Sequence, residues 1–427
     1  MSWKDRIKSV FSGAPEKKYS AAAPMMVQFG GHTPRFTPRQ YDRLAEEGYK
    51  KNVIAYRCIK LISQNAAAVP WAVRKKSGGK DILRDHPLLD LLQRPNPMQG
   101  GAEFFEAAFG FFLISGNSYI EAVGPSFPSA PRELWALRPD RMRVMPGDNG
   151  VPVAYRYTVG GSTHDYPRSR ILHVKSFNPL DDWYGMSPLE AAAISVDQHN
   201  DAARWNASLL QRSGRPSGAL IYKPTYPESS NTLTDEQRQA LKNELKNYFS
   251  GAENAGRPLV LEGGLDWKEM SLSPHDMDWL AGKDVSAREI ALAFHVPAQL
   301  IGIQGSLTFS NFEQARLALF DDAVLPLLDH MKDELNNWLA PQFGDGIEID
   351  YNIDKIEALA PRRQQIWDRI THADFMTINE KREAFGLEAI EGGDVLGNTL
   401  EAQPEEEHEE EPETVTQIMT GEENATL

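Results

Sequence analysis

The sequence predicts an α+β protein built from several compact units, and three observations point to this class. At 427 residues the chain can bury a large core and is longer than an ordinary single domain. Between residues 134 and 174, short β-forming runs are separated by Pro, Gly and Asp, as in a sheet. After residue 186 the pattern changes to helices whose starts carry capping residues. Strand-rich and helix-rich regions therefore follow one another along the chain.

The first half should combine helices with short strands. Residues 52–69 have the apolar period of a packed helix, which Pro70 ends. Residues 101–116 are strongly apolar and predict a buried helix, and residues 86–97 predict a brief helix closed by prolines. Strands are expected at residues 71–76, 117–123, 133–139, 142–146, 153–159 and 171–176.

A capping box marks the first helix of the second half. Ser187 precedes Pro188 and stands three residues before Glu190, so a helix should begin here and run to about residue 213. Its inner stripe is expected to consist mainly of small residues that allow close backbone approach: Leu189, Ala192, Ala193, Val196, Ala203, Ala207 and Leu210.

Two further helix starts follow. Thr234 and Gln237 predict a short helix between strands at residues 218–223 and 257–270, which makes a β-α-β insertion. Ser286, three residues before Glu289, is expected to start another helix that ends at Val296.

A loop with large apolar side chains precedes the longest predicted helix. Residues 303–309 carry Ile303, Leu307 and Phe309 among small and polar residues. Water-facing loops seldom expose such side chains, and buried loops leave backbone polar groups without partners. The loop therefore needs a special environment.

The helix after this loop should begin at Ser310, which forms a capping box with Glu313, and run to about Leu339. At 1.5 Å per residue its length is roughly 40 Å. Pro326 lies inside it and should kink it. Residues 315–328 are apolar almost all round, which indicates that neighbours enclose them. A strand at residues 347–353 and helices at 361–375 and 377–387 should follow.

The charge argues against a protein that holds nucleic acid through its phosphates. The net charge is −15, and residues 401–427 contain ten Glu and neither Lys nor Arg. Such a composition predicts a disordered tail. The tail contributes −10, so the rest of the chain carries −15 less −10, or −5. A mildly acidic body has the wrong sign for tight phosphate binding.

Motifs for catalysis, cofactors and metals are missing. The segments at residues 77–80 and 280–283 end in Gly-Lys but lack the upstream glycine of a phosphate-binding loop. No HExxH or nucleophile elbow occurs, and the single cysteine, Cys58, forms no disulfide framework. His275, Asp276 and Asp278 form a weak candidate metal or acid-base cluster. We expect no enzyme, no cofactor and no metal.

Several stretches, in this order and spacing, resemble the portal proteins of tailed double-stranded-DNA phages. This head-to-tail connector family also occurs in prophages and gene-transfer particles. The resemblance covers roughly residues 45–390. The stretches that carry it are residues 86–97, 116–123, 133–144, 171–192 and 255–274 and, above all, residues 294–302 and 308–315 with Phe320, 325–328 and 335–339.

The resemblance implies a multi-domain portal-like subunit with a β-rich wing, a helical stem, a small β-α-β clip, a long kinked helix and a helical crown. The expected boundaries are a flexible N-terminal arm at 1–40, the first part of the wing at 41–186, stem helices at 187–213 and 273–296, the clip at 214–272, a tunnel loop at 297–310, the long wing/crown helix at 311–344, the crown at 345–395 and the disordered acidic tail at 396–427.

The resemblance also implies a function. Portal subunits form a ring, typically of twelve copies, at one capsid vertex, around a channel through which double-stranded DNA passes without sequence specificity. The implied partners are the large terminase subunit, a head-tail adaptor and the major capsid protein, with no membrane. The expected location is the virion, after assembly in the host cytoplasm.

Two sets of residues acquire roles from the resemblance. The tunnel loop would line the narrowest part of the channel with Ile303, Gln304, Ser306, Leu307, Thr308 and Phe309. The clip would dock the motor or adaptor with Arg238, Lys242 and Lys246. In a ring the apolar loop side chains could pack on neighbouring loops, whereas in a single subunit they would pack beside Phe320.

Two other interpretations remain at this point. One is a structural adaptor or scaffold of the virion that handles no DNA, for which the small-residue stripe and the enclosed helix are ordinary core. The other is a hydrolase or nuclease that uses the cluster at residues 275–278. The native mass separates a ring from an adaptor, and a metal-dependent activity assay with His275→Ala tests the enzyme.

Overall fold

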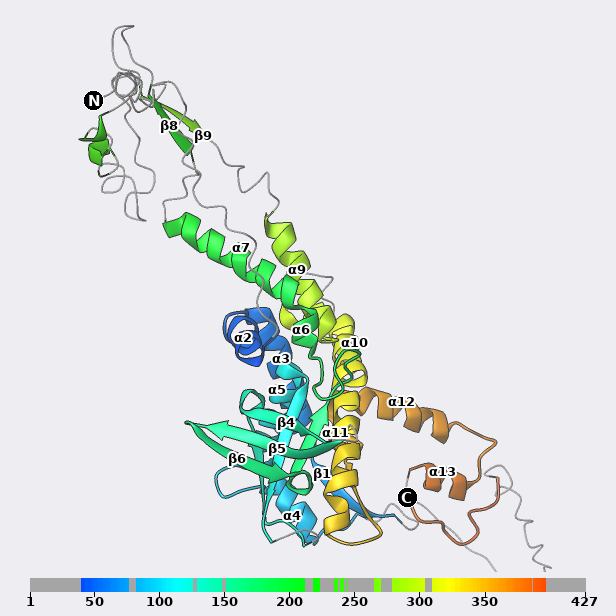
Figure 1. Cartoon of the computed structure of the whole chain (residues 1–427). Helices are drawn as coiled ribbons and strands as arrows, with labels where there is room; N and C mark the ends of the chain where they lie inside the picture. Colours follow the sequence, from blue (N-terminus) through cyan, green and yellow to red (C-terminus); the bar gives the residue numbers. More distant parts are fainter. Residues whose placement is uncertain are drawn as a thin grey trace, which may run out of the picture. The chain divides into compact units, whose positions relative to one another are not determined.

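A computed structural model describes most of the chain (Figure 1). Pro38–Leu427 forms one compact unit, to which all that follows refers. The described residues are 40–76, 82–125, 129–147, 151–211, 218–222, 234–236, 239–241, 243, 265–269, 279–303, 309–385 and 387–396.

Two packed helices form the centre of the core. α3 (Val53–Ala67) begins at Asn52, whose side chain accepts hydrogen bonds from the backbone of the first turn. α5 (Gly101–Ser115) packs along it and ends at Gly116, which adopts the left-handed conformation at φ +74°. Three phenylalanines of α5 are only 0–1% exposed: Phe104, Phe105 and Phe109. α4 (Pro87–Gln93) closes the core beside them, as the sequence predicts.

Short antiparallel sheets complete the region predicted to be the wing, and this name is kept below. One has the order β3-β2-β7 (Glu133–Leu137, Asn117–Val123 and Ile171–Lys175), and a second has the order β4-β5-β6 (Met142–Pro146, Pro152–Val159 and Ser162–Pro167). β1 (Trp71–Lys75) pairs with β10 (Ile347–Tyr351), so early and late parts of the sequence meet in one ribbon. β6 is not among the predicted strands, because its sequence STHDYP is polar and exposed and has no apolar alternation.

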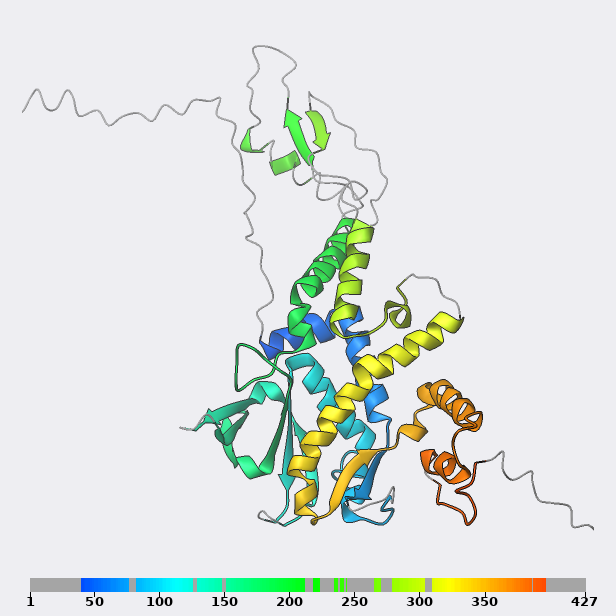
Figure 2. The same ribbon diagram turned by 90° about the vertical axis from the view of Figure 1, so that its right-hand side faces the viewer.

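Two strut helices follow the wing in sequence, as Figure 2 shows. A short helix, α6 (Pro188–Ala191), leads through Ala192 into the first strut, α7 (Ala193–Gln211). The second strut, α9 (Trp279–Ala293), packs along α7. Between them the structure describes the antiparallel pair β8 (Gly218–Tyr222) and β9 (Leu265–Glu269) and a few helical residues from 235 to 243. The predicted strands around the insertion therefore pair with each other.

The prediction that Ser286 begins a helix is wrong. Ser286 lies in the middle of α9, where it is buried and its hydroxyl donates a hydrogen bond to the carbonyl of Lys283. Serine in a helix interior can satisfy its hydroxyl on a preceding turn in this way, so the Ser-x-x-Glu pattern alone does not mark a start.

The long helix consists of three parts. α10 (Phe309–Leu319) passes through a π-helical segment, η6 (Phe320–Val324), into α11 (Leu325–Trp338). It starts one residue before the predicted Ser310. Pro326 stands in the first turn of α11, directly after the wide π turns. Because proline cannot donate a backbone hydrogen bond, this is where the regular α ladder is interrupted.

In the region predicted to be the crown (345–395), two short helices and the segment that follows them come after β10. α12 (Ala360–Thr371) and α13 (Ile378–Ala384) pack against each other. Thr377 and Glu380 form a complete capping box at the start of α13. Asn379 is buried and binds the returning chain, since its amide contacts the backbone of Ile390 and the carboxylate of Asp394.

Candidate functional site

The struts and the segments that anchor them form the candidate functional region. Ser187 caps α6 as predicted, and its hydroxyl accepts a hydrogen bond from the backbone of Glu190 at 2.9 Å. α7 then packs on α9, and Ser195 donates a hydrogen bond across the pair to Glu289 at 2.7 Å. Small buried residues permit this approach: Ala192, Ala193, Ala202, Ala287 and Ala291.

The predicted stripe is correct only for the first turns of the strut. Ala192, Ala193 and Val196 are buried, but Ala203 and Ala207 are exposed and Ala202 is buried in their place. The cause is the turn at Ala192, which separates α6 from α7 and shifts the helical register.

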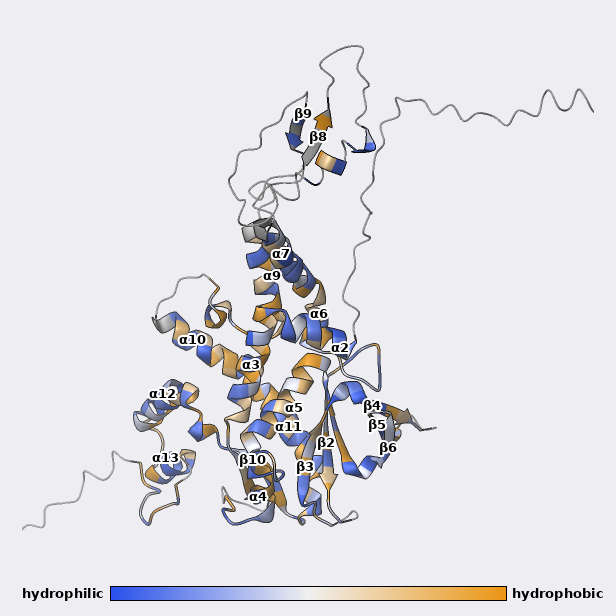
Figure 3. Ribbon diagram, turned by 90° about the vertical axis from the view of Figure 1, so that its left-hand side faces the viewer, coloured by the Kyte–Doolittle hydropathy of each residue, from blue (hydrophilic) through white to orange (hydrophobic). Residues whose placement is uncertain are grey.

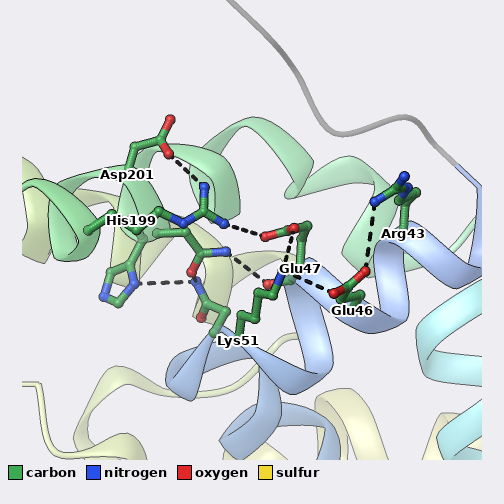
Figure 4. Close-up of polar contacts among 9 residues, drawn as sticks. Arg43, Glu46, Glu47, Lys51, His199 and Asp201 are labelled. Carbon is green, nitrogen blue, oxygen red and sulfur yellow. Dashed lines mark hydrogen bonds and ion pairs between the residues drawn. The ribbon is translucent and has the colours of Figure 1, made fainter.

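A buried cluster of amides ties the first strut to the wing (Figure 4). Asn52 accepts two backbone hydrogen bonds through Oδ1 as the cap of α3. Its amide nitrogen donates to Oδ1 of Asn200 on α7 at 3.0 Å and lies 3.3 Å from Nδ1 of His199. Asn200 in turn donates to the carbonyl of Glu47 at 2.9 Å. One side chain thus fixes both the start of α3 and the direction of α7, and we call this group the strut-base cluster.

The tautomer of His199 follows from these contacts. The two backbone donors fix the orientation of the Asn52 amide, so its nitrogen faces the imidazole. Nδ1 of His199 must then accept, and its proton resides on Nε2. Burial, with the nearby charge of Lys283, lowers the pKa of His199 below its ordinary value. The cluster is therefore compatible with neutral His199 and not with the imidazolium.

Ion pairs surround the strut-base cluster. Glu47 lies in the π-helical segment η1 (Leu44–Lys50), which follows the short helix α2 (Tyr41–Arg43). It binds Lys51 at 2.9 Å and Arg204 of α7 at 2.6 Å. Burial works to raise the pKa of the Glu47 carboxyl, but hydrogen bonds and charge from these two cations outweigh it and lower the pKa. Arg204 also reaches Asp201, and Figure 4 shows the whole network.

A second anchor holds the approach to α6. Oδ1 of Asn117 accepts from the backbone of Gly185 at 2.8 Å and lies 2.9 Å from Nε2 of His173. Burial, with a smaller effect of Lys175, lowers the pKa of His173 to about 3, so its ring is neutral and Nε2–H donates. A side chain at Gly185 would place Cβ 2.1 Å from the carbonyl oxygen of Gly116, so only glycine fits.

The predicted site residues are only partly described. Ile303 is 8% exposed, and its backbone donates to the carbonyl of Ala298 in the 3-10 turn η5 (Ala298–Ile301). Its side chain is buried in the single subunit, and its role in lining the channel stays a prediction. Phe309 is the first residue of α10, and its side chain is not described. The remaining predicted site residues lie outside the described residues: Gln304, Ser306, Leu307, Thr308, Arg238, Lys242 and Lys246.

Other chemistry is limited in the described part of the chain. No group of three or more potential metal ligands occurs among the described residues. The candidate cluster at residues 275–278 lies outside them. Within the same described ranges, no helix has the length and apolar composition required to cross a membrane.

Sequence reasoning missed the strut-base cluster. Asn52 stands directly before an apolar helical pattern, and Asn is a favoured N-cap, so its capping role could have been found. His199 and Asn200 have no comparable signal, because nothing in a helical pattern shows which polar residues face a distant segment.

Comparisons with known proteins identify the family. Residues 54–386 match the model of the family described as phage portal protein. An uncharacterized protein of Rickettsia bellii (strain RML369-C) is 44% identical over 360 residues, which are 83% of this chain and 91% of that protein. The portal protein of Enterobacteria phage HK97 is 25% identical over 352 residues, which are 80% of each chain.

Solved structures have the same fold. A chain from the neck of a native gene transfer agent particle, computed with C12 symmetry, is 45% identical with a TM-score of 0.63, and the match covers 84% of this chain and 97% of that one. An HK97-family portal protein from Corynebacterium diphtheriae is 14% identical with a TM-score of 0.53, covering 75% of this chain and 96% of that one, and supports the fold alone. The chain belongs to the phage portal protein family.

Proposed function

We propose that this chain forms a ring of twelve subunits at one vertex of a capsid, around a channel for double-stranded DNA. The observation that carries the proposal is the likeness to the neck chain of the gene transfer agent particle, which spans nearly all of that chain and comes from a particle computed with C12 symmetry. Packaging and ejection of DNA are the general role of portal proteins. The ring is located in the virion and is assembled in the host cytoplasm.

The charge of the chain supports passage of DNA without tight binding. Each phosphate that a protein neutralises adds salt-dependent affinity, and this affinity would resist sliding. The chain outside residues 401–427 carries a net charge of −5, and residues 303–309 contain no Lys or Arg. DNA can therefore move past this loop without strong electrostatic attachment.

The arrangement of elements supports a structural role. The strut-base cluster holds the first strut, and the second strut packs along it. Residues 304–308 lie between η5 and α10 in the sequence. In this proposal the insertion at 214–272 docks the large terminase subunit and then a head-tail adaptor, and the wing contacts the major capsid protein. The chain itself has no enzymatic activity and requires no cofactor.

The first test is assembly. The purified chain should form closed rings with a central hole, visible by negative-stain microscopy and measurable as a dodecamer by native mass spectrometry. Monomers or dimers at every protein concentration and salt concentration would contradict the ring and favour an adaptor.

The second test concerns the predicted channel loop. We expect that replacing Gln304–Thr308 by a Gly/Ser linker leaves rings and empty shells intact, because the struts and α10 are unchanged. DNA protected from nuclease inside particles should then be lost. Ser306→Lys should slow packaging in a salt-dependent way, since the ring would gain up to about a dozen phosphate contacts. Normal protected DNA with both variants would exclude the loop from transport.

The third test concerns docking. Charge reversal of Lys242 and Lys246 should weaken binding of the terminase motor or the adaptor and leave rings intact. Loss of rings in this double variant would make the segment an assembly element instead.

A further inference from the structure

α3 exposes a mixed apolar and basic stripe near its start. Val53 is 66% exposed and Tyr56 is 43% exposed, although both stand in a helix of the central core. Arg57 is exposed beside them, and Lys50 is exposed at the end of η1. The ring of Tyr56 lies 5.0 Å from that of Tyr49, which holds the aromatic surface in place. We call Lys50, Val53, Tyr56 and Arg57 the α3 patch.

α9 exposes a second stripe with the opposite charge. Val285 is 52% exposed and Leu292 is 75% exposed, and Glu289 lies between them on the same face. Asp284 and Arg288 also lie on this side. Nε of Arg288 is 2.9 Å from a carboxylate oxygen of Asp284, so the charges of this pair cancel. The carboxylate of Glu289 gives this surface its net negative charge. We call Val285, Glu289 and Leu292 the α9 patch.

The two patches lie on different parts of one subunit, one at the start of α3 and one along α9. α3 and α9 are in contact, and each buries the opposite stripe of its surface in the shared core, Cys58 and Ile62 on α3 and Ile290 and Phe294 on α9. On each helix the patch therefore lies away from the buried stripe of that helix. Figure 3 shows the hydropathy of the residues along α3 and α9. Both patches are exposed in the single subunit, so neither covers the other.

We propose that the α3 patch of one subunit docks on the α9 patch of a second copy, as the head-to-tail contact of the ring. This inference rests on the proposed ring and deepens it by naming the surfaces that meet. A cyclic ring is held by a heterologous contact, in which two different and complementary patches of neighbouring subunits meet. The two patches meet that requirement. Their apolar side chains would exclude water at the centre of the contact, and the cations of the α3 patch would face Glu289 of the α9 patch and set the register.

The charges exclude the symmetric alternatives. Two α3 patches placed face to face would bring Lys50 and Arg57 against identical cations. Two α9 patches would oppose their Glu289 carboxylates. Like charges across an interface are unfavourable, so an isologous dimer through either patch is disfavoured and the heterologous contact is favoured.

The decisive test is a charge exchange. Arg57→Glu and Glu289→Arg should each lower the fraction of chains in rings at least about tenfold, because each places like charges across every contact. The double variant Arg57→Glu/Glu289→Arg should restore rings, since the attraction is re-formed with reversed sign. Arg94→Glu, an exposed reversal at the end of α4, serves as the matched control and should assemble normally. Circular dichroism of each variant verifies that the subunit is folded.

A covalent test identifies the neighbours directly. Tyr56→Cys/Leu292→Cys should give, on oxidation, a ladder of disulfide-linked chains in a non-reducing gel, while either single variant should give no ladder. The native Cys58 is buried, and burial raises the pKa of its thiol to about 12, so it does not compete.

The outcomes separate this inference from the proposed ring. Wild-type chains that never form rings would overturn the ring itself. Wild-type rings, together with normal assembly of both charge-reversal variants or the absence of a ladder, would overturn the pairing of these two patches and leave the ring standing. Loss of rings in the double variant with both single variants folded would also count against the pairing.

Discussion

The central wing core and the crown helix α12 differ in how far they bury their apolar side chains. Phe104, Phe105 and Phe109 of α5 are almost completely buried within one subunit. α12 has no buried residue, and Ile366 and Trp367 on it are 44% and 55% exposed. The wing is therefore stabilised by its own packing, whereas α12 is held by contacts at its edges.

The edge contacts of α12 are few and mostly polar. Trp367 packs on Phe385 of α13 with ring centroids 4.5 Å apart. Arg363 donates to the carbonyl of Ile356 at 3.0 Å, and a cavity of about 780 Å³ lies between α12, α13 and β10. The difference teaches that α12 should open locally at a lower free-energy cost than the wing core, because few apolar side chains hold it in place.

The largest expected effect is in the wing. Phe105→Ala should lower the free energy of unfolding by about 3–5 kcal/mol, because it leaves a cavity in close-packed core. Urea unfolding followed by circular dichroism measures this loss. Trp367→Ala in α12 is the matched aromatic truncation and should cost less than about 1 kcal/mol. Equal losses for the two variants would remove the distinction between the regions.

A smaller effect is expected at the strut-base cluster. Asn52→Ala removes the cap of α3 and leaves Asn200 without its donor, which should cost about 1–3 kcal/mol. Asn352→Ala removes the corresponding cap of the 3-10 turn η8 (Ile353–Lys355) near the crown. This control should lose only a few tenths of a kcal/mol, since that turn is exposed. A larger loss for the control, measured in urea, would contradict the assigned role of Asn52.

Acid should weaken the same cluster. The folded-state pKa of His199 lies below that of the unfolded chain, so its contribution to stability is complete above pH 6.5 and is lost as the pH falls below this value. His173, with its pKa near 3, adds to the same decline. His199→Gln should therefore reduce, but not abolish, the fall in the free energy of unfolding as the pH drops below 6.5. An unchanged pH profile would show that His199 is not held neutral.

The smallest expected effect is on an exposed ion pair of the crown. Arg362 binds Asp321 of the long helix at 2.9 Å, and both side chains are well exposed. Arg362→Ala should change the global free energy of unfolding by less than about 1 kcal/mol. Hydrogen exchange of the amides in α12 should nevertheless become faster, because this helix has few other attachments. Unchanged exchange would mean that its packing, and not this pair, sets its position.

Local signals in the sequence predicted most of the fold. Ser187 and Pro188 mark the true start of α6, and alternating apolar residues locate β2 and β5, because capping and alternation depend on neighbours in sequence. Ser286 carries the same capping signal in the middle of α9, where tertiary packing decides its role. The π-helical turns of η6 and the polar strand β6 have no such local signature.

The candidate site was less predictable than the fold. The family resemblance correctly named a portal protein, whereas the predicted tunnel loop falls mainly on residues outside the described ranges. It could not reveal the contact of Asn52 with Asn200, because that contact depends on how two distant helices meet. Ile303 was assigned to the channel by analogy, whereas its burial depends on the packing of η5 inside the subunit.

The pairing of β1 with β10 constrains how a newly synthesised chain can fold. Trp71 is opposite Tyr351 in this ribbon, and their rings meet edge to face. The ribosome must therefore make both struts, the insertion and the long helix before the ribbon can close, on the order of tens of seconds after β1 emerges. Closure across so long a stretch of chain is entropically costly and slow. A truncated chain that ends before β10 lacks this closure, so only chains that reach beyond Tyr351 can complete this ribbon.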